Sequence, residues 1–208
     1  MINIVLPIAG RGSRFAEAGF ELPKPLLLVH GKPMIEVVVD NINIEANHIF
    51  IVQKEHYEKY NLEETLNRVY ENCTIVQIDE VTDGAACTTL LAREFIDNDE
   101  PLLIANSDQF VEWDSNEFMY SMVGDNTDGG ILTFPSKHPK WSYAKLDEDG
   151  YVTRVEEKKP ISDKATVGIY YWTKGSDYVK YADKMIEEEK KVNNEYYVCP
   201  VYNEAIED

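Results

Sequence analysis

INIVLPIAGRGSRF, residues 2–15, joins a short apolar run directly to a loop that contains two glycines. The apolar run predicts a buried strand. Gly10 and Gly12 have no Cβ, so the loop can turn tightly and let the phosphates of a ligand approach its backbone N–H groups. Arg14 adds a permanent positive charge in a shape that matches phosphate oxygens. The stretch therefore predicts a phosphate-binding loop after the first strand.

A lysine held between two prolines, Pro23-Lys24-Pro25, follows ten residues after Arg14. Both proline rings fix φ, so the segment that carries Lys24 is stiff. A dinucleotide-binding loop would need a third glycine where Phe15 stands, and no Walker A pattern occurs. For the glycine loop taken alone, a plain turn after an edge strand remains the simplest alternative.

Three blocks together resemble the signature of the sugar-phosphate nucleotidyltransferases: Gly10-x-Gly12-x-Arg14, Pro23-Lys24-Pro25 and Gly31-Lys32-Pro33-Met34-Ile35. The resemblance implies an α/β fold with three αβα layers, Rossmann-like and related to the GT-A fold. It implies a mainly parallel central sheet with a small β-hairpin subdomain on the acceptor side. We expect a single domain over residues 1–208, with a nucleotide-binding half (1–135) and an acceptor-binding half (136–208).

The amino-acid composition excludes some classes of binding partner and favours others. The net charge of −18 argues against binding to nucleic acid or to an anionic membrane. Residues 1–35 differ, since they carry four basic side chains against two acidic ones, which suits a polyanionic ligand. No apolar run reaches membrane-spanning length and no secretory signal is visible. The three widely spaced cysteines indicate reduced thiols, so we expect a cytoplasmic protein, for which a homo-oligomer remains open.

The hydrophobic pattern alternates between strands and helices, as in a largely parallel sheet covered on both faces. Because the chain ends inside an expected helix, the resemblance also suggests a further C-terminal segment. We expect strands at 48–52, 74–78, 101–105, 129–134 and 165–172, a hairpin over 141–155, and helices at 32–42, 54–69 with a break near Asn61, 84–92, 115–123 and 175–191.

The nucleotide site implied by the resemblance has two parts. The backbone and side chains of the glycine loop would hold the triphosphate, and Gly84 and Ala85, at a helix start capped by Thr82 or Asp83, would hold the base. An acidic residue facing the base would suit the amino group of cytosine better than the O4 atom of uracil. An ordinary capped helix is the alternative for this stretch. The expected nucleotide-binding residues are Ala9, Gly10, Arg11, Gly12, Ser13, Gln77, Asp79, Glu80, Gly84 and Ala85.

The expected catalytic residues are Arg14, Lys24 and Asp108. Asp108 follows a fully apolar strand, at the edge where open α/β sheets bind their ligands. By the resemblance it would hold Mg²⁺ against the triphosphate. The second aspartate of the family does not stand in register, and Asn203 is the nearest candidate for that metal ligand. A strand-end capping role would explain Asp108 without a metal.

The acceptor side resembles the family less closely. Glu157 and Lys158 match a carboxylate that contacts the acceptor and a lysine that contacts its phosphate, although Lys159 intervenes before Pro160. Gly168 belongs to the matching strand. The remaining expected acceptor residues, Trp141 and Tyr143, would wall the pocket. A solvated charge run and aromatic core residues are the alternatives here.

The implied reaction transfers a nucleotidyl group from a nucleoside triphosphate to a small phosphorylated acceptor and releases pyrophosphate, with Mg²⁺ as cofactor. Three stretches, IAGRGSRF (8–15), VTDGAAC (81–87) and EYYVCPVYN (195–203), resemble a cytidylyltransferase branch of capsule and polysaccharide loci. We therefore expect CTP, with a phosphoamino compound such as phosphoglutamine or a sugar 1-phosphate as acceptor. A glycosyltransferase of related fold and a non-catalytic nucleotide-binding regulatory subunit are the alternatives.

Overall fold

The computed structural model describes residues 1–124 and 127–208, without the side chains of Arg14 and Ala16. The strands are β1 Asn3–Pro7, β2 Leu28–Val29, β3 Lys32–Pro33, β4 Asn47–Gln53, β5 Thr74–Ile78, β6 Leu102–Ala105, β7 Gly129–Pro135, β8 Ser142–Leu146, β9 Val152–Glu157 and β10 Lys164–Trp172. The α-helices are α1 Ser13–Glu17, α2 Met34–Ile42, α3 Lys54–Lys59, α4 Leu62–Val69, α5 Ala85–Leu90, α6 Arg93–Ile96, α7 Ser115–Gly124, α8 Gly175–Glu187 and α9 Val201–Ile206, and η1 Lys24–Leu26 is a 3₁₀ turn.

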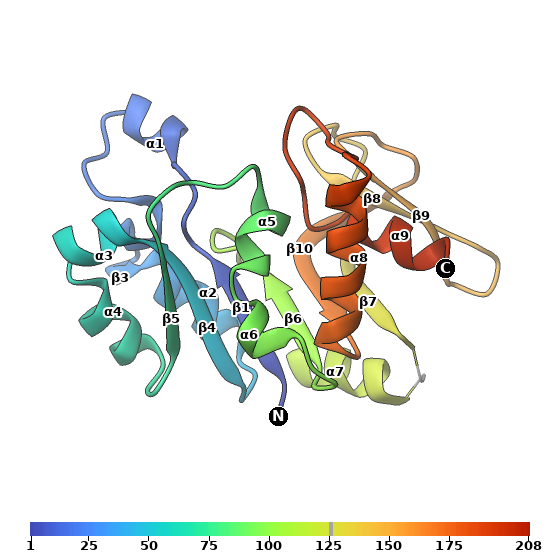
Figure 1. The fold of residues 1–208 in the computed structure, drawn as a ribbon, viewed down its shortest axis with the longest axis horizontal. Helices are drawn as coiled ribbons and strands as arrows, with labels where there is room; N and C mark the ends of the chain where they lie inside the picture. Colours follow the sequence, from blue (N-terminus) through green and yellow to red (C-terminus); the bar gives the residue numbers. More distant parts are fainter. Residues whose placement is uncertain (125–126) are drawn as a thin grey trace.

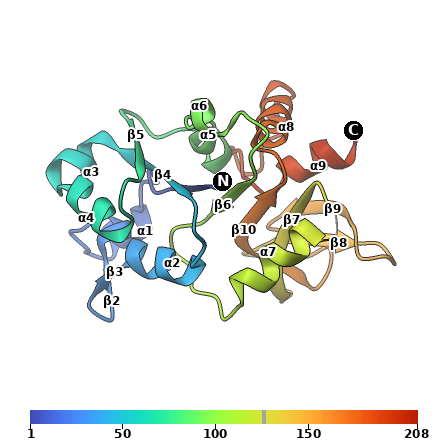
Figure 2. The same cartoon turned by 90° about the horizontal axis from the view of Figure 1, so that it is seen from below.

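Within the described ranges, an eight-stranded sheet forms the middle layer, and helices lie on both sides of it (Figure 1, Figure 2). The strand order is β5-β4-β1-β6-β10-β8-β9, and β7 pairs with β10 beside this path. The short β2–β3 ribbon is separate. The expected three-layer αβα architecture is therefore confirmed.

The first half of the sheet is parallel. Strand β1 lies between β4 and β6, with Ile4 opposite His48 on one side and Leu103 on the other, and β5 continues from β4. Strands β1 and β6 are buried along nearly their whole length, which explains why their sequences are apolar without alternation. The carboxyl ends of these strands meet at one edge, at the top of Figure 1.

The second half of the sheet is antiparallel. Strand β10 pairs with β6, β7 and β8, and β9 follows β8 as the outer strand of the expected hairpin. The hairpin thus extends the central sheet rather than standing beside it. The pairing of β10 with β7 shifts between Thr166 and Tyr170, and Gly168 lies in this irregularity with φ at +89°.

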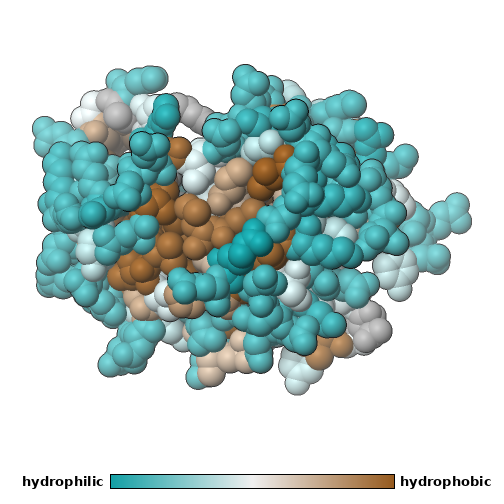
Figure 3. Space-filling model, viewed as in Figure 1, coloured by the Kyte–Doolittle hydropathy of each residue, from teal (hydrophilic) through white to brown (hydrophobic). Residues whose placement is uncertain are grey.

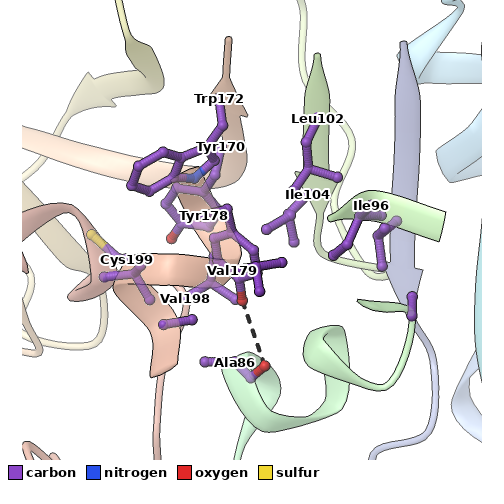
Figure 4. Close-up of a cluster of buried hydrophobic side chains, with 14 of the residues drawn as sticks. Ala86, Ile96, Leu102, Ile104, Tyr170, Trp172, Tyr178, Val179, Val198 and Cys199 are labelled. Atoms are coloured by element: carbon purple, nitrogen blue, oxygen red, sulfur yellow. Dashed lines mark hydrogen bonds between the residues drawn. The ribbon is translucent and has the colours of Figure 1, made fainter. Parts of the chain in front are cut away.

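Two hydrophobic clusters attach the helices to the sheet. One contains side chains of α5, α6, α8 and α9, and Figure 4 shows Ile96, Ile104 and Trp172 in it, with the Tyr178 hydroxyl donating to the Ala86 carbonyl at 3.5 Å. The other cluster packs α2, α4 and α7 on the opposite face. On the face seen in Figure 3, hydrophobic residues gather at the centre and hydrophilic residues surround them. Burial of this apolar surface is the main force that holds the layers together.

The helix boundaries agree with the sequence-based predictions at some positions and differ at others. The helical stretch after β4 breaks at Asn61, which has φ at +48°, as expected. The helix expected from Lys32 begins at Met34, because Pro33 is its N-cap. The predicted cap of α5 is wrong: Gly84 occupies the N-cap with no side-chain hydrogen bond, while the Thr82 hydroxyl donates to the Gly84 carbonyl. No helix in the described ranges has both the length and the apolar composition to cross a membrane.

Candidate active site

The glycine loop leaves β1 at the carboxyl edge of the parallel strands. Gly12 has φ at +58°, a left-handed conformation that favours glycine, and its carbonyl accepts from the Phe15 N–H at 2.9 Å. A Cβ built on Gly12 would lie 3.7 Å from the Cβ of Lys24, so the loop runs beside the lysine segment. Ala9 is buried, whereas Gly10, Arg11 and Ser13 are exposed, so Ala9 can serve a ligand only through its backbone.

The backbone of Arg14 lies in α1, and its side chain falls outside the described part of the structure. Its predicted contact with the phosphates therefore stays a prediction. Lys24 begins η1, directly after Pro23, whose extended backbone starts the turn. The Lys24 ammonium lies 5.9 Å from the ring centroid of Phe15, the residue that stands where a dinucleotide-binding loop would have glycine.

Lys24 and Asp108 form a direct ion pair, with the Lys24 Nζ donating to Asp108 Oδ2. The two residues are 84 positions apart in the sequence and come from η1 and from the segment after β6. The side chain of Lys24 is 25% exposed and that of Asp108 is 43% exposed, so a ligand can reach both. The structure thus brings together the predicted phosphate-binding lysine and the predicted metal-binding carboxylate.

Gly168 shapes the segment that carries Asp108. Its carbonyl accepts from the Asn106 N–H at 2.9 Å and from the Gln109 side-chain amide at 3.4 Å. Gly168 has φ at +89°, a conformation that favours glycine, and a Cβ there would also lie 2.1 Å from Asn106 Nδ2 and 2.7 Å from Gln109 Oε1, so both side chains would have to move. The expected acceptor residue Gly168 therefore contacts Asn106 and Gln109, which lie on either side of Asp108 in the same segment.

Main-chain hydrogen bonds join the predicted base site to the segment before α9. The Tyr196 N–H donates to the Asp83 carbonyl at 2.8 Å, and the Ala86 N–H donates to the Tyr196 carbonyl at 3.0 Å. Lys191 lies 2.8 Å from Asp83 and lowers the pKa of that carboxyl group through a side-chain hydrogen bond. Gly84, between these contacts, has φ at +131° and ψ at 171°, a combination essentially limited to glycine.

The polar candidates for base recognition are exposed. Gln77 lies in β5, and Asp79 and Glu80 follow that strand at the same edge of the sheet. Asp79 Oδ1 is 3.8 Å from the ammonium of Lys54, a weak surface pair. Ala85 is the first residue of α5 and is half-buried. All three polar side chains are accessible to a ligand, and which of them meets a base stays a prediction.

The predicted acceptor side contains a buried carboxylate. Glu157 is 8% exposed and accepts a hydrogen bond from the Ser142 hydroxyl. Burial raises the pKa of Glu157, and the hydrogen bond from Ser142 acts in the opposite direction. The next residue, Lys158, has φ at +55° and donates to the Tyr197 hydroxyl, with its ammonium 4.5 Å from the Tyr197 ring centroid.

The two expected aromatic walls have different environments. Trp141 is half-buried, packs edge-on against Phe134 at 5.3 Å, and accepts from the Lys158 N–H through its carbonyl at 3.0 Å. Tyr143 is fully buried, and its hydroxyl donates to the His138 carbonyl at 2.6 Å. Trp141 therefore lies beside Lys158, whereas Tyr143 belongs to the core and cannot wall a pocket in this structure.

Asn203 has a structural role in place of the expected metal contact. Its Oδ1 accepts from the Val155 N–H at 2.9 Å and its Nδ2 donates to the Val155 carbonyl at 3.0 Å, which joins α9 to β9. Both ends of the amide are occupied, so Asn203 is not available as a metal ligand. Among the described residues, no group of three or more His, Cys, Asp or Glu side chains could hold a metal ion.

Four neighbours of the predicted site are not among the residues predicted from the sequence: Gln53, Gln109, Ser142 and Tyr197. Gln53 carried a usable signal, because it ends a strand parallel to β1 and so reaches the same edge of the sheet. Gln109 follows Asp108 directly. No sequence signal identified Ser142 or Tyr197, because their roles depend on contacts with Glu157 and Lys158.

Known proteins give the same picture of the fold. The chain is 26% identical to a nucleoside-diphosphate-sugar pyrophosphorylase from Vibrio cholerae, with a TM-score of 0.80 over 98% of this chain and 87% of that one. A UDP-glucose pyrophosphorylase solved with UDP-glucose shares the fold at 18% identity, with a TM-score of 0.76 over 100% of this chain and 88% of that one.

Two curated relatives are the bifunctional proteins GlmU of Methanocaldococcus jannaschii and Methanococcus aeolicus. The chain is 22% identical to the first over 83% of its own length and 27% identical to the second over 81%. It spans only 40% and 39% of the lengths of these relatives. The family model described as nucleotidyl transferase matches residues 2–207. The chain therefore belongs to the nucleotidyl transferase family.

Proposed function

We propose that this protein transfers a nucleotidyl group from a nucleoside triphosphate to the phosphate of a small acceptor and releases pyrophosphate. The observation that carries the proposal is the contact between Lys24 and Asp108 beside the glycine loop. A lysine next to a phosphate-binding loop and a carboxylate within reach of it are the groups that a triphosphate and its metal require.

The chemistry asks little of the protein beyond positioning and charge. The acceptor phosphate is already ionised at neutral pH, so no general base is required. We assign the backbone of residues 10–13 and Arg14 to the β- and γ-phosphates, which leave as pyrophosphate. Lys24 lies between the α-phosphate and the acceptor phosphate and offsets the charge that grows there. Lys158 attracts the acceptor phosphate, and Glu157 contacts the rest of the acceptor.

The residues present are compatible with Mg²⁺. This ion usually keeps several water molecules and binds through one or two carboxylates together with substrate phosphates. Asp108 is an exposed carboxylate beside the proposed phosphate site and would supply that ligand. Bound Mg²⁺ would reduce the negative charge of the triphosphate. With Asn203 occupied by Val155, Asp108 is the protein ligand that we retain in the proposal.

We propose CTP as the nucleotide. The support is chemical: the polar side chains Asp79 and Glu80 at the base site are acidic and exposed, and a carboxylate accepts from the amino group of cytosine. The proposed acceptor is a phosphoamino compound or a sugar 1-phosphate, in capsule or surface polysaccharide synthesis. UTP is the competing nucleotide, since one structural relative was solved with UDP-glucose.

The test is pyrophosphate release with each of CTP, UTP, dTTP, GTP and ATP, with Mg²⁺ and a panel of phosphorylated acceptors. We expect release with CTP that depends on an acceptor. Release with another nucleotide alone would keep the reaction and contradict the assignment of CTP. Transfer of a sugar from a nucleotide-sugar without pyrophosphate would indicate a glycosyltransferase, and nucleotide binding without turnover would indicate a regulatory subunit.

Lys24→Ala tests the mechanism. We expect kcat to fall by at least about a hundredfold, because one well-placed charge that stabilises a transition state contributes that much. Lys32→Ala is the matched control, since Lys32 comes from the same part of the chain but pairs with Glu36 and Asp40 on the surface. Near-normal turnover in Lys24→Ala, with the same unfolding transition as wild type, would refute the assigned role.

A further inference from the structure

Gln53 makes two hydrogen bonds to the glycine loop. Its Nε2 donates to the Ala9 carbonyl at 2.9 Å and to the Gly10 carbonyl at 3.1 Å. Both partners are acceptors, so the nitrogen end of the amide must face them. Gln53 is the last residue of β4 and is half-buried, 44 positions from Ala9 in the sequence. One side chain thus fixes two consecutive peptide groups of the loop.

Because the peptide group is planar, these contacts also fix the direction of the N–H groups that follow each carbonyl. The described bonds contain no cis peptide, and in a trans peptide the C=O and the following N–H point in opposite directions. With the carbonyls of Ala9 and Gly10 turned toward Gln53, the N–H groups of Gly10 and Arg11 point away from it. In the described part of the chain these two N–H groups donate to no protein acceptor, and both residues are exposed, so a ligand can reach them.

Gln53 does not use its side chain for the helix that it begins. It is the N-cap of α3, and it makes no capping hydrogen bond there. The N-cap side chains that satisfy the first N–H groups of a helix are Ser, Thr, Asp and Asn, and Gln is not among them. Here the amide is directed at the loop beside Lys24 instead, so its contacts stabilise the loop and not α3.

We propose that Gln53 is a positioning residue for the phosphate loop. It holds the Ala9 and Gly10 carbonyls away from the phosphate site, so that the Gly10 and Arg11 N–H groups are oriented to bind the leaving phosphates. The inference rests on the proposed function and goes beyond it, because it names a residue outside the loop that determines phosphate affinity. Free carbonyls turned toward a phosphate would repel it, so a loop without this constraint binds more weakly.

Gln53→Leu tests the proposal, since it removes both donors and keeps most of the volume. Isothermal titration with inorganic pyrophosphate, CTP and the nucleoside cytidine, each with Mg²⁺, separates phosphate binding from base binding. We expect pyrophosphate and CTP to bind about five- to tenfold more weakly, the loss typical of one or two net hydrogen bonds, and cytidine to bind as in wild type. The KM for CTP should rise by a similar factor, and kcat should change less.

Asn67→Leu is the matched control, because the Asn67 amide also donates to a backbone carbonyl, that of Glu63, but within α4. Should Gln53→Leu fail to fold, Gln53→Glu keeps the size and replaces the donor with an acceptor, and the same weakening is expected. Unchanged affinity for pyrophosphate, or an equal loss for cytidine, overturns the proposal. Wild-type protein that binds pyrophosphate but releases none from any triphosphate contradicts the proposed function and leaves the role of Gln53 intact. Binding of neither phosphate ligand overturns both.

Discussion

Gly84→Ala is the substitution for which the structure predicts the largest local effect. At Gly84 a Cβ would lie 2.4 Å from the carbonyl oxygen of Tyr196 and 2.6 Å from its nitrogen. Contacts this short do not occur, and both atoms belong to backbone, so a side-chain rotation cannot relieve them. The residue also has φ at +131° and ψ at 171°, which side chains other than hydrogen rarely tolerate.

The magnitude follows from three contributions. The backbone conformation costs about 1–3 kcal/mol for a residue other than glycine. To make room, the segment at Tyr196 must move away, which breaks its hydrogen bonds with Asp83 and Ala86 at 2.8 and 3.0 Å. Each of these bonds contributes about 1 kcal/mol net. We therefore expect the free energy of unfolding to fall by about 3–5 kcal/mol, the sum of these three contributions.

Urea unfolding followed by circular dichroism measures this loss. Gly124→Ala is the control, because Gly124 is the last residue of α7 and no atom of the described residues beyond its chain neighbours lies within 4 Å of an added Cβ. That variant should be as stable as wild type or slightly more so. If Gly84→Ala loses less than about 1 kcal/mol and keeps the same KM for nucleotide and acceptor, then the contact with Tyr196 does not hold the base site in place, and the reasoning is refuted.

Three further predictions concern titration and the acceptor side. Burial lowers the pKa of His48 from 6.5 to about 4. The free energy of unfolding should therefore be highest above pH 6.5 and fall by up to about 3 kcal/mol as the pH drops from 6.5 to 4, because the unfolded chain binds this proton more tightly. Urea unfolding of His48→Phe should lack this part of the pH dependence. Burial raises the pKa of Glu157, so the folded protein binds this proton more tightly and stability should fall as the pH rises above 4.5; Glu157→Gln should flatten that slope, and an unchanged slope would contradict the assignment. Tyr197→Phe removes the hydroxyl that binds Lys158 and should raise the KM for the acceptor about fivefold with no change for the nucleotide, whereas equal changes in both would show a general distortion.

The parts of the fold that the sequence could predict depend on local patterns. Strand β5 was predicted with its exact bounds of Thr74–Ile78, because an apolar β-branched run stands between polar residues. The glycine loop and the Lys24 segment were recognisable for the same reason, since each motif lies within a few residues. Their contact in space then follows from the topology, because both lie near the carboxyl edge of the parallel strands.

The predictions that failed depend on contacts between distant segments. Trp141 directly precedes β8 and Tyr143 lies within it, so residues two apart would share one face of a strand and the sequence alone does not separate them. The structure buries Tyr143 completely and leaves Trp141 half-buried. The place of Asn203 relative to the family pattern predicts a metal ligand, but α9 packs on β9 and directs the amide to Val155. Hydrogen-bond partners so far apart in sequence have no local signature.

The site contains residues that would meet a substrate and residues that hold them in place. Three predicted residues that would meet a substrate are each held by a neighbour outside the predicted set: Gly10 by Gln53, Gly84 by Tyr196, and Lys158 by Tyr197. The first member of each pair carries the charge or the close backbone approach that the chemistry requires, so its type is restricted and forms a recognisable motif. The second member needs only a donor or a backbone group at the right place, and the fold supplies that place through strand order and loop length. Replacing Gln53 or Tyr197, which act through their side chains, should therefore change substrate affinity more than the rate of the chemical step.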